Sequence, residues 1–149
     1  MQSIMKLQVG VKALIKDSEG RFLFLKRTLP YKGESVPRWE IPGGRIDVGE
    51  PIFQALAREI KEETGLIMKS EPKILYAQDI LRLNEKHIVR LTFEVQTEPG
   101  EIILDTSDPN GTHHNDFIWV TPEDIKNLYH DLYLTPIFKL LGIEPNWTS

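Results

Sequence analysis

The segment from Pro51 to Gly65 constrains the fold more than any other part of the sequence. Proline suits the first turn of a helix, and glycine favours the left-handed conformation that ends one. Between them, apolar residues such as Leu56 and Ile60 recur at helical spacing. The pattern predicts an amphipathic helix over about 51–64, so the rest of the chain has to supply an apolar surface for its buried side.

The same helix carries three glutamates on one side. Glu59 and Glu63 are four residues apart, and Glu62 follows Glu59 by three, so their carboxylates fall within about one third of the circumference. Such like charges cost an isolated helix roughly 0.2–0.5 kcal/mol per pair, and the macrodipole also disfavours acids near the C-terminus. Something cationic has to compensate. Arg58, Lys61 and solvent offer one explanation, and a bound metal ion offers another.

Apolar runs on both sides of this helix predict strands, and turn residues separate them. The predicted strands are 7–16 and 22–25 as one β-hairpin, 39–41 before a turn at Pro42–Gly44, 73–83 and 87–96 as a second hairpin around Asn84–Lys86, a short strand at 102–104, and 117–120. Loops are expected at 28–37 and 105–116, and further helices after Thr121 and over 136–141. This order predicts a single mixed-sheet α/β domain over residues 1–149.

Composition excludes several classes of function. The chain has 18 Lys and Arg against 22 Asp and Glu, a net charge of −4, which lacks the basic footprint of a protein that binds long nucleic acid. It has no cysteine, so disulfides, thiolate nucleophiles and Cys-ligated zinc are excluded. Neither a secretory signal nor an apolar run of about 18 residues is present, so we expect a cytoplasmic protein without a membrane partner.

The spacing around the glutamates is specific. It runs Gly44, five residues, Glu50, seven residues, Arg58-Glu59-Ile60, one residue, Glu62-Glu63, one residue and Gly65-Leu66. These 23 contiguous residues match every fixed position of the Nudix box, so the sequence resembles a Nudix hydrolase of the MutT-like type. The segments 39–44 and 119–124 also resemble the stretches that precede the box and close the domain in this family.

The resemblance implies a fold, an activity and a site. The expected fold is α/β, with a mixed β-sheet sandwiched between helices (α/β/α). The expected activity is metal-dependent hydrolysis of a phosphoanhydride bond in a nucleoside diphosphate-linked substrate, first of all a nucleoside triphosphate that gives the monophosphate and pyrophosphate. By resemblance, the catalytic residues and metal ligands are Glu59, Glu62 and Glu63, and the supporting residues are Gly44, Glu50, Arg58 and Gly65.

The expected chemistry explains why carboxylates are needed. A diphosphate resists attack because negative oxygens shield its phosphorus, so a hydrolase has to neutralise that charge and place a water in line. Mg²⁺ prefers oxygen ligands and is usually held by one or two carboxylates together with substrate phosphates. Mg²⁺ is therefore the expected cofactor, with Mn²⁺ as a substitute, and the general base stays unassigned among the three glutamates.

Residues outside the box are weaker candidates. Arg27 follows a strand and precedes the long loop, where it could contact phosphate, although a solvated strand arginine is the commoner case. His113 and His114 are interpreted as a solvated pair because adjacent histidines rarely face one site. Family members often place a glutamate near His113, so the source of any extra carboxylate is open, with these candidates: Glu94, Glu98, Glu101 and Asp116. Four aromatic residues are assigned to the core rather than to a base pocket: Tyr31, Trp39, Phe117 and Trp119.

Three alternatives remain at this stage. A relative of the same type could act on ADP-ribose or a dinucleoside polyphosphate, since nothing outside the box selects the substrate. A non-catalytic nucleotide-sensing Nudix module would commonly lack box glutamates, which this chain retains. An isomerase on this scaffold typically uses His and Cys ligands, and the absence of cysteine counts against it. The expected partner is a nucleotide-linked small molecule, and the oligomeric state is open, with a homodimer among the alternatives.

Overall fold

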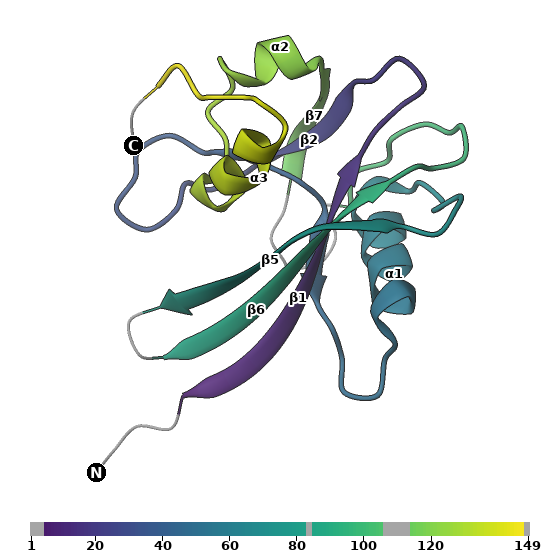
Figure 1. Ribbon diagram of the computed structural model, residues 1–149, viewed down its shortest axis with the longest axis vertical. Helices are drawn as coiled ribbons and strands as arrows, with labels where there is room; N and C mark the ends of the chain where they lie inside the picture. Colours follow the sequence, from purple (N-terminus) through teal and green to yellow (C-terminus); the bar gives the residue numbers. More distant parts are fainter. Residues whose placement is uncertain (1–4, 83–84, 106–113, 148–149) are drawn as a thin grey trace.

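The computed structural model describes residues 5–82, 85–105 and 114–147, which form two β-sheets flanked by helices (Figure 1). In chain order the elements are β1 (Lys6–Ile15), β2 (Phe22–Arg27), β3 (Trp39–Glu40), β4 (Gly43–Arg45), α1 (Ile52–Thr64), β5 (Lys73–Arg82), β6 (Lys86–Val95), β7 (His114–Val120), α2 (Pro122–Ile125), the 3-10 helix η1 (Leu132–Leu134) and α3 (Thr135–Leu140). None of the helices in these ranges is both long and apolar enough to cross a membrane.

The larger sheet is mixed and has the strand order β4-β1-β6-β5. Strand β1 runs parallel to β6 along its whole length and antiparallel to β4. Strands β5 and β6 pair antiparallel, which confirms the second predicted hairpin. Its expected turn lies partly outside the described residues, since 83–84 are not among them. The smaller sheet is antiparallel, in the order β3-β2-β7.

The first predicted hairpin is wrong in its pairing. Strands β1 and β2 form where the apolar runs predict them, but they belong to different sheets and meet only at the bridge between Lys16 and Phe22. The physical reason is that each is a central strand with a neighbour on both sides. Strand β1 pairs with β6 along its whole length and with β4 at Gly10–Lys12, and β2 pairs with β7 and, at Leu25–Lys26, with β3. The short connection therefore turns the chain from one sheet into the next.

Three local predictions also need correction. The Pro42–Gly44 turn is followed at once by β4, because Gly43 and Gly44 pair with β1. Residues 102–104 form no strand, since the Ile103 amide donates to the Thr64 carbonyl at the end of α1 (2.8 Å). The loop predicted to reach residue 116 ends earlier, because β7 begins at His114, and residues 106–113 lie outside the described part.

Two apolar clusters fill the layers between the sheets and the helices. The first joins the buried side of α1, including Leu56 and Ile60, to one face of the strands. The second joins α3, including Ile137 and Phe138, to the other side. Figure 1 shows α1 and α3 on opposite sides of the strands. The α/β fold with helices on both faces of mixed sheet structure is therefore confirmed.

The long loop between β2 and β3 is held at its far end by a buried arginine. Arg38, only 2% exposed, pairs with Glu34 (2.6 Å) and donates to the His130 carbonyl (2.8 Å). Its guanidinium also stacks on the rings of Tyr129 (4.1 Å) and Trp147 (5.5 Å). Residues near the C-terminus thus fix where this loop returns to the sheet.

Candidate active site at the glutamate helix and the central cavity

Helix α1 forms where the sequence predicts it, and its two ends are defined by the predicted residues. Pro51 precedes the first turn in an extended conformation, and Gly65 ends the helix with φ of 76°, its amide donating to the Lys61 carbonyl (2.9 Å). Thr64 is buried and donates its hydroxyl to the Ile60 carbonyl (2.6 Å). These contacts fix the rotation of the last turn, which carries the glutamates.

The two glycines of β4 let the helix carboxylates approach the sheet. The amide of Gly43 donates to Glu63 Oε2 at 2.6 Å. A Cβ atom at Gly44 would lie 2.5 Å from Glu59 Oε1, and one at Gly43 would lie 2.1 Å from the Val11 carbonyl oxygen. Side chains at these positions would therefore displace either the carboxylate or the neighbouring strand.

Arg58 organises the helix and the loop before it. Its guanidinium makes a two-pronged ion pair with Glu50 (2.7 and 2.9 Å) and also donates to the Arg45 carbonyl (3.2 Å). Glu50 and Arg58, two of the expected supporting residues, are therefore joined by a salt bridge. One nitrogen of Arg58 also contacts Glu59 (2.9 Å) and Glu62 (3.2 Å). The arginine thus neutralises part of the charge that the three glutamates accumulate.

The remaining charge shows in the pKa values of the two inner glutamates. Burial raises the pKa of Glu63 to about 8, and the carboxylates of Glu59 and Glu40 add to the rise against the opposing charge of Lys12. Burial also raises the pKa of Glu59, with Arg58 opposing and Glu62 adding. Both side chains are held in a place where ionisation is costly unless a further cation is bound.

These residues fit a divalent cation that is shared with a substrate. Within the described ranges, no three His, Asp or Glu side chains form a ready ligand cluster, and Glu62 is 54% exposed on the outer side of Arg58. Mg²⁺ needs only one or two protein carboxylates when phosphate oxygens and water complete its shell. Glu59 and Glu63, whose pKa values are raised and which lie close to the glycine backbone of β4, are two carboxylates that fit this requirement.

Glu63 lies at one side of a cavity of about 360 Å³, here called the central cavity. Its floor is the mixed sheet, where Gly10 carries no side chain, and its charged lining residues are Lys12, Arg27, Arg45, Arg90, Glu40 and Glu63. Four cations against two carboxylates suit an anionic ligand of several charges. A larger cavity of about 470 Å³ near the β1–β2 connection is lined by Glu98, one of the candidate extra carboxylates, but by none of the three helix glutamates.

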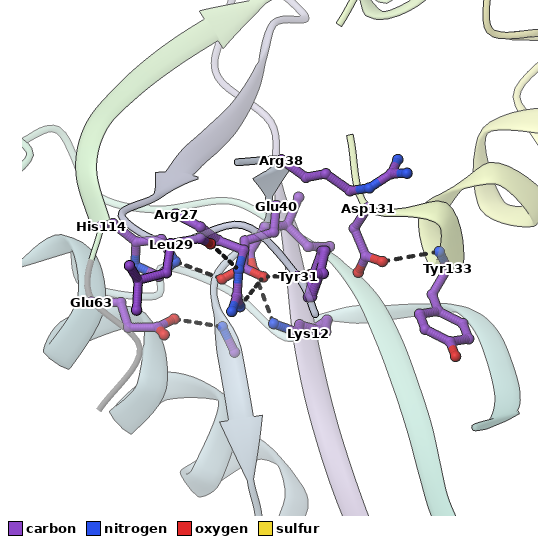
Figure 2. Close-up of polar contacts among 12 residues, drawn as sticks. Lys12, Arg27, Leu29, Tyr31, Arg38, Glu40, Glu63, His114, Asp131 and Tyr133 are labelled. Carbon is purple, nitrogen blue, oxygen red and sulfur yellow. Dashed lines mark hydrogen bonds and ion pairs between the residues drawn. The ribbon is translucent and has the colours of Figure 1, made fainter. Parts of the chain in front are cut away.

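The structure places the weaker candidates differently from the prediction. Arg27 does line the central cavity, where it contacts Glu40 (3.4 Å) and stacks on the Tyr31 ring (4.2 Å), as Figure 2 shows. The interpretation of His114 as a solvated residue is wrong, because β7 starts there and buries it to 3% exposure against Glu40 (2.6 Å). His113 lies outside the described residues. Tyr31 is a cavity residue rather than a core residue.

The extra carboxylate in the cavity is one that the sequence reasoning missed. None of the four candidates, Glu94, Glu98, Glu101 and Asp116, lines the central cavity, whereas Glu40 does. The available signal was an acid between Trp39 and Ile41 in a strand whose neighbours are largely buried. Burial opposes ionisation of Glu40, but Lys12, a hydrogen bond from His114 and the charge of Arg27 bring its pKa to about 2.

Comparison with known proteins identifies the class. The NUDIX domain matches residues 6–141. Similar proteins include the ADP-ribose pyrophosphatase of Methanocaldococcus jannaschii, 31% identical over 63% of this chain and 53% of the relative. The nucleoside triphosphatase NudI of Escherichia coli K12 is 28% identical over 77% of this chain and 82% of the relative. The chain thus spans about half the length of the first relative.

A solved structure gives the same result. The MutT protein from Methanosarcina mazei Go1 is 25% identical, with a TM-score of 0.74 over 95% of this chain and 96% of that one. An α/β fold that holds a glutamate helix against a glycine strand beside a cationic cavity is the arrangement found here. The chain belongs to the NUDIX domain family, as the spacing of its residues predicts.

We predict that Gly44→Ala removes activity while the protein stays folded. The added Cβ would meet the Glu59 carboxylate at 2.5 Å, and a flexible carboxylate can move away at little cost to the core. Turnover should fall by about 100-fold or more, because a misplaced catalytic group is costly, and the circular dichroism spectrum should not change. Gly100→Ala is the control, since its Cβ would meet only Leu66 at 3.5 Å. Normal turnover in the Gly44 variant would contradict the importance of this contact.

We further predict that the metal-free protein loses stability with rising pH because of Glu63. Between its ordinary pKa of 4.5 and the folded value of about 8, the folded state holds a proton that the unfolded chain releases. The free energy of unfolding therefore falls as pH rises through this window. In EDTA, the melting temperature of Glu63→Gln should exceed that of the wild type at pH 9 but not at pH 4. The exposed Glu62→Gln is the control, and parallel curves for wild type and Glu63→Gln would refute the assignment.

Proposed function

We propose that this protein is a metal-dependent pyrophosphohydrolase that cleaves a phosphoanhydride bond in a nucleoside diphosphate-linked substrate. The observation that carries the proposal is the central cavity, where the carboxylate of Glu63 and four cationic side chains face one space. Membership of the NUDIX family and the complete glutamate set on α1 support it. The first candidate substrate is a nucleoside triphosphate that yields the monophosphate and pyrophosphate.

In this proposal Mg²⁺ is bound by Glu59 and Glu63, with Glu62 as a further ligand, directly or through water, and Mn²⁺ can replace it. Bound there, the ion supplies a charge clamp on the phosphate oxygens and favours an attacking hydroxide. Arg58 and Glu50 keep the helix and its preceding loop in register so that the carboxylates stay on the cavity side. One of the three helix glutamates also accepts the proton of the attacking water.

The cationic residues have a separate part. Lys12 and Arg90 lie on the neighbouring strands β1 and β6 of the cavity floor, and Arg27 lies on β2 beside Glu40. Ionised phosphate oxygens repel an attacking nucleophile. Donors that are already fixed around these oxygens offset their charge and so lower the barrier to attack. This placement favours substrates with two or more linked phosphates.

A second candidate substrate is ADP-ribose, which is favoured by the name of the Methanocaldococcus jannaschii relative, an ADP-ribose pyrophosphatase. The triphosphate is preferred because the NudI relative, named a nucleoside triphosphatase, matches a larger share of both chains. Dinucleoside polyphosphates and a purely nucleotide-sensing role follow as alternatives. We also propose that residues 1–149 form one Nudix domain and that the protein acts in the cytoplasm, as a monomer or a homodimer.

We predict that Glu59→Gln and Glu63→Gln each lower turnover by about 100-fold or more, since metal-assisted charge stabilisation is worth several kcal/mol. Both substitutions preserve size, so the melting temperature at neutral pH should stay within a few degrees of the wild type or rise. Steady-state assays in Mg²⁺ measure the effect, with the exposed Glu101→Gln as the control. Near-normal rates for both glutamate variants would refute the assignment of the metal ligands.

The substrate is tested with a panel of nucleoside triphosphates, ADP-ribose and dinucleoside polyphosphates, incubated with Mg²⁺ in the presence and absence of EDTA. Chromatography of the products identifies the bond that is cut. EDTA-sensitive release of monophosphate and pyrophosphate from a triphosphate is the expected result. Cleavage of ADP-ribose alone would select the second candidate, and no cleavage of any compound would contradict the enzymatic proposal.

A further inference from the structure

Glu40 is an acid in a cavity that otherwise suits an anion. Its side chain is 8% exposed, and each of its two oxygens has its own partners. Oε1 contacts His114 Nε2 at 2.6 Å, whereas Oε2 accepts from the Tyr31 hydroxyl at 3.1 Å and from Arg27 at 3.4 Å (Figure 2). The carboxylate therefore joins β3, β2, β7 and the loop after β2 at one point.

Simple electrostatics makes this placement unfavourable for binding phosphate. A negative charge on the cavity wall repels an anionic ligand, and the repulsion is stronger where water is excluded. An acid at this position is explained if it performs a task that outweighs the repulsion. The contacts of Arg27 indicate what that task is.

Arg27 is held on several sides. Its Nε donates to the Leu29 carbonyl at 3.2 Å, its Nη1 contacts Glu40, and its guanidinium plane lies 4.2 Å from the centre of the Tyr31 ring. A guanidinium has five donors in a rigid plane, so it can keep these bonds and still donate to a ligand. A fixed plane loses less entropy when it binds phosphate than a mobile one does.

His114 fixes the other oxygen of Glu40. It pairs with Arg27 across β2 and β7, at a shift in register that follows Lys26. Such irregularities redirect a side chain, and here His114 is 97% buried with its Nε2 on Glu40. With Oε1 occupied in this way, Oε2 is aimed at Arg27 and Tyr31.

We propose that Glu40 is a positioning residue, held by His114 and Tyr31, that orients Arg27 toward the phosphate groups of the substrate. This inference rests on the proposed function, because it takes the ligand of the central cavity to be a diphosphate. It goes beyond that function by assigning positioning roles to Glu40, His114 and Tyr31, which all lie outside the glutamate helix.

The test is the binding of inorganic pyrophosphate in the presence of Mg²⁺, measured by calorimetry with Glu40→Gln. Loss of a negative charge alone would tighten binding of an anion. Loss of the positioning role should instead weaken it by about tenfold, since a mispositioned charge-assisted bond is worth that much or more. The two explanations thus predict changes of opposite sign, and unchanged or tighter binding would overturn the proposal.

A double-variant comparison shows whether Glu40 acts through Arg27. Arg27→Ala should weaken pyrophosphate binding, and adding Glu40→Gln to it should cause no further loss. Independent, additive losses would overturn the proposal. Asp79→Asn is the matched control, because Asp79 forms the same kind of pair with His87 (2.7 Å) on the exposed end of the sheet, and its affinity should equal the wild type.

A second variant and the wild type distinguish a failure of the positioning role from a failure of folding or of the proposed function. If Glu40→Gln does not fold, Tyr31→Phe gives the second measurement, since it removes only one hydroxyl bound to Glu40, and affinity should fall about threefold. Unchanged affinity in that variant would overturn the proposal. Absence of pyrophosphate binding to the wild type would overturn both this inference and the proposed function, whereas normal wild-type binding with an unweakened Glu40→Gln would overturn the positioning role alone.

Discussion

The contact between β4 and the last turn of α1 is the constraint on which the rest of the site depends. The amide of Gly43 holds Glu63 at 2.6 Å, and the bare backbone of Gly44 leaves room for the Glu59 carboxylate. Because β4 also pairs with β1, the glutamates are fixed relative to the floor of the central cavity. Burial penalises the ionised form of both side chains, so a cation bound beside them would stabilise that form.

The remaining charges are arranged around that contact in two groups. Arg58 and Glu50 neutralise the outer side of the helix and have no place in the cavity. Glu40 belongs to the inner group, where it shares one space with Glu63 and with cations from the sheet. The separation matters because the first group can stabilise the scaffold without competing for the ligand. In the proposed function, the second group determines which anionic substrate binds and in which orientation.

The sequence was sufficient for features that are encoded locally. Pro51 and Gly65 define the ends of α1 by their own backbone preferences, and the spacing of the glutamates identifies the family. Pairing between β1 and β2 was predicted wrongly because both are central strands, a property of the whole sheet and not of either segment. His114 and Glu40 were missed for the same reason. They are 74 residues apart, and only the pairing of β2 with β7 and β3 brings them together.

The stacking of Arg38 on Tyr129 and Trp147 has a consequence for how such a protein can diversify. The loop that carries Tyr31 is anchored at Arg27 on one side and at Arg38 on the other, and neither anchor involves the glutamate helix. Length and composition between the anchors can therefore vary while the glutamate helix keeps its geometry. Selection for a new substrate can therefore act on the loop between Arg27 and Arg38. Substitutions near the C-terminus, at Tyr129 or Trp147, can also change the position of this loop.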